Sequence, residues 1–80
     1  NYFMSVGLAG QLGPLSTSLR QSKSCDAAKA EDALLTRLEP ALTVAATSST
    51  QGIADFAKGL LGNLPPEKTF VAGMIKEACH

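Results

Sequence analysis

Apolar side chains recur at the spacing of an α-helix along the second half of the chain. The first set follows the i, i+3, i+4, i+7, i+8 pattern and comprises Ile53, Phe56, Ala57, Leu60 and Leu61. The second set comprises Phe70, Val71, Met74, Ile75 and Ala78. This period places each set on one face of a helix, and that face has to be buried against other helices. Val and Ile, the usual residues of strands, are few, so the sequence predicts an all-α fold.

Glycine and proline interrupt the helical pattern in the first third of the chain. We expect a first helix over residues 2–12 that ends at Gly13 and Pro14, because glycine in a helix interior costs about 1 kcal/mol relative to alanine. Pro14 suits the first position of a new helix. Residues 14–23 are therefore expected to form a second short helix or a loop.

The next helix is expected to run from Cys25 to Glu39. Either Ser24 or Asp26 can cap its N-terminus. Pro40 lacks a backbone donor and clashes with the preceding turn, so it should end or kink this helix near Glu39. The apolar stripe can continue for a short distance beyond the kink.

Two more interruptions divide the C-terminal part of the chain. Gly62 and Asn63 tolerate the conformation of a helix C-cap, so they should stop the helix that begins near Ile53. Pro66 suits the first turn of a last helix that ends near Ala78. The sequence therefore predicts a bundle of four to six short helices.

The chain is short enough for only one domain, which we expect to cover residues 1–80. Residues 1–23 should form an uncharged N-terminal helix or arm and the short second helix, and residues 24–80 the main helical core. A core of this size supplies about 3–5 kcal/mol, so a covalent link or a partner subunit would matter for stability.

Two cysteines, Cys25 and Cys79, lie at the ends of expected helices. An internal bridge would close a loop of about 55 residues and stabilise the fold by about 4 kcal/mol. We expect this bridge; intermolecular bridges in a dimer and free thiols are the alternatives. A disulfide implies an oxidising compartment and hence a secreted protein.

Composition argues against several classes of function. Seven basic residues balance seven acidic ones, so the chain lacks the positive field that gathers nucleic acid. His80 is the single histidine, and no CxxC or HxxxH spacing is present, so we expect no metal site and no cofactor. A terminal histidine is a poor general base, and the adjacent Glu31 and Asp32 are expected on a solvated face. We therefore do not expect an enzyme.

Large apolar side chains remain as candidates for a binding role. We interpret them first as core and second as the lining of an apolar ligand site between helices. The candidates are Phe3, Met4, Leu38, Phe56, Leu60, Phe70 and Met74. No charged side chain precedes Arg20, so the N-terminal segment can either cover the bundle or insert into a membrane or partner.

A local resemblance supports a secreted helical protein. The run Leu60-Leu61-Gly62-Asn63-Leu64-Pro65, followed by a helix that ends in Cys79, resembles the last helices of secretoglobins. That resemblance implies a small secreted protein that dimerises through terminal cysteines around an apolar cavity. It covers residues 60–79, and it departs at Cys25, because secretoglobins place the partner cysteine near the N-terminus.

These observations favour a small secreted helical protein that binds an apolar small molecule, a lipid or a protein partner. A membrane-active or toxin-like protein that inserts residues 2–12 is one alternative. A structural subunit of a larger assembly is another. Zero net charge also favours self-association, so a homo-oligomer is a further expectation.

Overall fold

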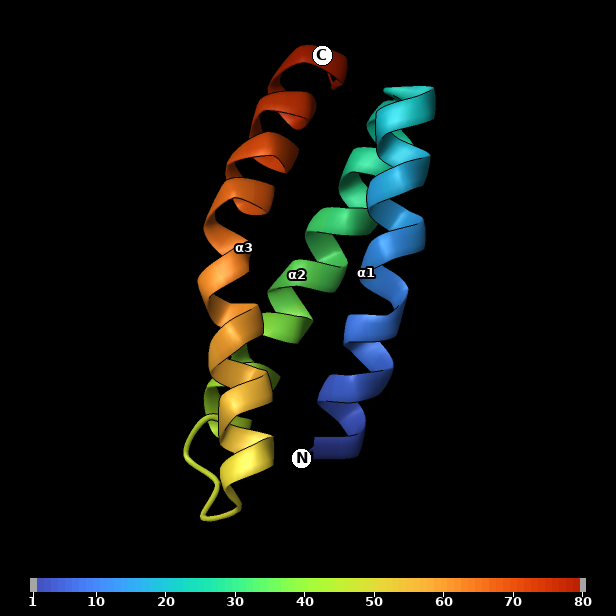
Figure 1. The fold of residues 1–80 in the computed structure, drawn as a ribbon. Coiled ribbons are helices and arrows are strands. Elements are labelled where there is room, and N and C mark those ends of the chain that lie inside the picture. The colour runs from blue at the N-terminus through green and yellow to red at the C-terminus, as the bar shows by residue number, and fades with distance from the viewer. Residues whose placement is uncertain (1, 80) are drawn as a thin grey trace.

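The computed structural model describes residues 2–79, and these form three α-helices with no strand. They are α1 (Tyr2–Ser22), α2 (Cys25–Ala45) and α3 (Gln51–Ala78). The helices run up, down and up, with α2 between α1 and α3 (Figure 1). The all-α prediction is confirmed, whereas the prediction of four to six short helices is wrong.

The central helix α2 supplies most of the core. Its buried side chains alternate at spacings of three and four residues, the seven-residue repeat of helices that pack side by side. They are Ala28, Glu31, Leu35, Leu38, Leu42 and Ala45, with Leu34 beside them. The outer helices add Leu8 and Leu19 from α1 and Leu64 and Val71 from α3. The result is an elongated bundle of 44 × 18 × 15 Å.

Pro14 and Pro40 lie inside helices that continue past them. The predicted end at Gly13 is therefore wrong. Of the two outcomes expected at Pro40, the helix does not end near Glu39, and the apolar stripe continues beyond the proline as far as Ala45. A proline inside a helix removes the hydrogen bond to the carbonyl four residues earlier. These carbonyls belong to Gly10 and Thr36, whose residues are exposed, so water can hydrogen-bond to them. The loss of these two hydrogen bonds therefore costs little free energy. Burial of the apolar side chains before and after each proline keeps each helix continuous.

The predicted break at Gly62 and Asn63 is also wrong, because α3 continues through Pro65 and Pro66. Three buried residues at intervals of seven span this region: Ala57, Leu64 and Val71. One uninterrupted helix keeps all three on the face that packs against α2. A break at Gly62 would have put the two halves of this stripe out of line.

The short turn between α1 and α2 is shaped by one left-handed residue and a helix cap. Lys23 adopts a left-handed conformation, with φ of 51°, which turns the chain between α1 and α2. The Ser24 hydroxyl then accepts a hydrogen bond from the backbone N–H of Ala27 at 3.1 Å and caps α2, as one of the two predicted caps. Cys25 follows directly and is disulfide-bonded to Cys79, with the two Cα atoms 5.0 Å apart. The bridge fastens the end of α3 to the turn between α1 and α2, which confirms the expected internal pairing.

Candidate functional site

Large apolar side chains are exposed at the end of the bundle where α1 begins. Among the side chains that the structure describes, the exposed large apolar ones are Phe3, Met4, Val6 and Val44, with exposed fractions of 83%, 57%, 40% and 63%. Because α1 and α2 are antiparallel, the start of α1 lies level with the end of α2 (Figure 1). We call these four residues the apolar end. It lies opposite the disulfide along the length of the bundle.

The predicted apolar candidates separate into two groups. Leu38 is fully buried in the core. Four more are partly buried and pack against the core: Phe56, Leu60, Phe70 and Met74. Phe3 and Met4 lie instead on the surface at the apolar end. The structure therefore places five of the seven in the core or against it and two on the surface.

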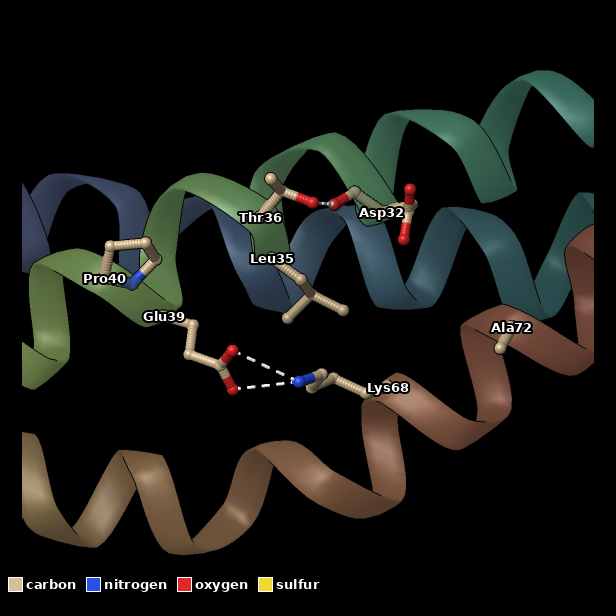
Figure 2. Close-up of a pocket in the computed structure, with 7 residues that line it drawn as sticks. All are labelled: Asp32, Leu35, Thr36, Glu39, Pro40, Lys68 and Ala72. Carbon is tan, nitrogen blue, oxygen red and sulfur yellow. Dashed lines mark hydrogen bonds and ion pairs between the residues drawn. The ribbon is translucent and has the colours of Figure 1, made fainter.

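A shallow groove of about 320 Å³ lies between α2 and α3 (Figure 2). It is lined by Asp32, Leu35, Thr36, Glu39, Pro40, Lys68 and Ala72. Across it, the Lys68 ammonium donates hydrogen bonds to both carboxylate oxygens of Glu39, at 3.0 and 3.2 Å. The groove therefore combines apolar surface with a charged pair that crosses it.

A second unusual feature lies where the three helices meet. The Glu31 side chain of α2 has an exposed fraction of 0%, so the expectation of a solvated face is wrong for this residue. It occupies a core position of the seven-residue repeat, and no N–H or alcohol group of the described residues donates to either of its carboxylate oxygens. Its close neighbour is the carboxyl group of Glu67 on α3.

Glu67 is hydrogen-bonded to two side chains of α1. Its carboxylate accepts a hydrogen bond from the Ser16 hydroxyl at 2.8 Å and another from the Arg20 guanidinium at 3.0 Å. The same guanidinium lies over the ring of Phe70, 4.1 Å from its centre, a cation–π contact that helps to hold it in place. We call Glu31, Glu67, Ser16 and Arg20 the carboxyl cluster.

The two carboxyl groups differ in their affinity for a proton. Burial raises the pKa of Glu31 to about 8. The hydrogen bond with Glu67 and the negative charge of Glu67 raise this pKa further, whereas the positive charge of Arg20 lowers it. The hydrogen bond with Glu31 lowers the pKa of Glu67, and so do Ser16 and Arg20, against the effect of its partial burial. At neutral pH the cluster therefore holds a protonated Glu31, an ionised Glu67 and the Arg20 cation.

A signal for this cluster was present in the sequence. Glu31 lies three residues after Ala28 and four before Leu35, which are core positions of α2. Glu67 lies seven residues after Leu60 and seven before Met74, on the apolar stripe of α3. Reading the seven-residue repeat through these acidic positions would have placed both carboxyl groups between the helices.

The fold and these features define a three-helix protein closed by one disulfide. Comparison with protein-family models, with curated proteins and with solved structures gives no match. The intrachain bridge also differs from the intermolecular pairing that the secretoglobin resemblance implies.

Over the described residues, no three His, Cys, Asp or Glu side chains come together in a group that could hold a metal ion. Within the same part of the chain, no helix combines the length and the apolar character needed to cross a membrane.

Proposed function

We propose that this chain is a small secreted helical protein that binds an apolar small molecule or lipid at its apolar end. The observation that carries the proposal is the exposure of Phe3, Met4, Val6 and Val44, which all lie at the end of the bundle where α1 starts and α2 ends. Exposed apolar residues that gather in one place mark sites of interaction more often than singly scattered ones. The proposal assigns the chain to binding and not to catalysis.

The surroundings of the apolar end favour an uncharged ligand. Helix α1 carries no charged side chain before Arg20, sixteen residues after Met4. Residues 2–19 offer apolar surface, glycine and hydroxyl or amide groups, so this part of the apolar end has no charged side chain to pair with a ligand. Binding would depend on the removal of apolar surface from water, which contributes about 1.5–3 kcal/mol for each large side chain that is fully covered.

The disulfide supports the secreted part of the proposal. Cysteine pairs form and persist mainly in oxidising compartments, and the pair Cys25–Cys79 is fully formed here. In so short a chain such a bridge replaces stability that a larger core would supply.

The double variant F3S/M4S is expected to bind the apolar dye Nile red at least tenfold more weakly than the native chain. The change removes two of the four exposed apolar side chains, and a loss of about 1.4 kcal/mol is a factor of ten in affinity. Fluorescence titration of Nile red, repeated with phosphatidylcholine vesicles, measures the effect. Thermal unfolding of the variant checks that the bundle is intact.

The matched control is A30S/A72S, which adds hydroxyl groups at two exposed alanines away from the apolar end. It should bind the dye like the native chain. Equal binding by F3S/M4S and the native chain would contradict the proposal, and so would weaker binding by the control, because Ala72 lines the groove. Light scattering that shows a native dimer and a monomeric F3S/M4S would assign the apolar end to a second copy and also overturn the proposal.

A further inference from the structure

The carboxyl cluster is built from all three helices. Ser16 and Arg20 come from α1, Glu31 from α2 and Glu67 from α3. The charged groups that act on Glu31 are Glu67 and Arg20, one from each helix that packs against α2. A polar group at one core position of packed helices is a known means of setting their register, at a cost in stability.

Two ionised carboxylates would leave this cluster electrically unbalanced. Arg20 provides one positive charge and is already paired with Glu67. An ionised Glu31 would then be a buried charge whose two oxygens have no donor, and such a charge is costly. One proton on Glu31 removes this cost, because the O–H group can donate to a Glu67 oxygen while Ser16 and Arg20 donate to the same carboxylate.

We propose that Glu31 and Glu67 form a one-proton site that joins α2 to the contact between α1 and α3, and that loss of this proton destabilises the bundle. In the step itself the O–H bond of Glu31 breaks, the proton passes to bulk water, and the electron pair stays on the carboxylate. The stability of the bundle then depends on pH and is greatest in mildly acidic solution. The proposal does not depend on the binding role of the apolar end.

The direction of the effect follows from proton counting. The folded chain keeps the Glu31 proton up to a higher pH than the unfolded chain, because the pKa of Glu31 rises on folding from 4.5 to about 8. Between these values the folded state holds more protons, so the stabilisation is complete at and below pH 4.5 and is lost as the pH rises toward 8. The folding equilibrium constant should therefore fall by up to tenfold for each pH unit in this window.

Urea unfolding at pH 5.5 and pH 7.5 tests the proposal. For the native chain we expect the folding equilibrium constant to be at least tenfold lower at pH 7.5. The variant E31Q should lose most of this pH dependence, because its side-chain amide donates a hydrogen bond to Glu67 at both pH values. The control E39Q makes the same isosteric change at the exposed pair with Lys68 and should keep the native pH dependence.

A native chain that is equally stable at both pH values would overturn the proposal, and so would an E31Q variant with the native pH dependence. If E31Q does not fold, carbon-13 NMR of the Glu31 carboxyl group in the native chain decides the question. A titration midpoint more than two pH units above that of an ordinary glutamate supports the shared proton. A midpoint near 4.5 overturns it.

Discussion

The variant C25S/C79S is expected to lose about 4 kcal/mol of its free energy of unfolding. The bridge joins residues 54 positions apart, and a loop of this length restricts the unfolded chain strongly. In a domain of this size the same loss corresponds to a melting temperature lower by roughly 20 °C. Urea unfolding followed by circular dichroism measures the change.

Reductant provides the matched control for the bridge. The native chain in reductant should become about as unstable as C25S/C79S, while the variant itself should not respond to reductant. Unfolding midpoints that agree between native and variant chains without reductant would contradict the role given to the disulfide.

The variant L38A is expected to lose about 3 kcal/mol, the second largest effect. Leu38 has an exposed fraction of 0% and lies at the centre of α2, which packs against both α1 and α3. Truncation of a fully buried leucine removes apolar contacts and leaves a cavity, at a cost of about 2–5 kcal/mol. The same urea experiment measures the loss.

Val44 supplies the comparison within the same helix. It is 63% exposed, so V44A should change the stability by less than about 0.5 kcal/mol. If L38A and V44A had similar effects, the placement of the core along α2 would be incorrect.

Helical periodicity and cysteine position could be read from the sequence, because both are local signals. The stripes from Ile53 to Leu61 and from Phe70 to Ala78 lie in one helix, and the two cysteines pair as expected. The number of helices could not be read in this way. Whether Pro40 ends a helix depends on whether water can reach the carbonyl of Thr36, and that depends on how the helices pack.

The candidate sites depend even more on tertiary structure. Acidic residues are usually solvated, so Glu31 was expected on the surface, and only packing of α1 and α3 around α2 buries it. Phe3 shows the opposite effect. As one of the few aromatic residues it is an obvious candidate for the core. It lies instead on the face of α1 opposite the fully buried Ser5, where it is 83% exposed.

The disulfide, the carboxyl cluster and the apolar end lie at different positions along the elongated bundle. The disulfide fastens the end where α2 starts and α3 ends, the carboxyl cluster joins the three helices between the ends, and the apolar end lies where α1 starts and α2 ends. Because the cysteines lie far from Phe3 and Val44, the bridge can hold the helices together without covering the apolar end. This arrangement is consistent with a rigid scaffold that presents a binding surface.

The most direct test of the central claim, that the apolar end is the binding surface, is a map of the bound probe on the protein. Nile red is titrated into nitrogen-15-labelled native protein and the amide chemical shifts are followed. We expect the largest shifts at the first turns of α1, around Phe3 and Val6, and at the last turn of α2, around Val44. Shifts concentrated along the groove between Glu39 and Lys68, or among core residues such as Leu38, would contradict it.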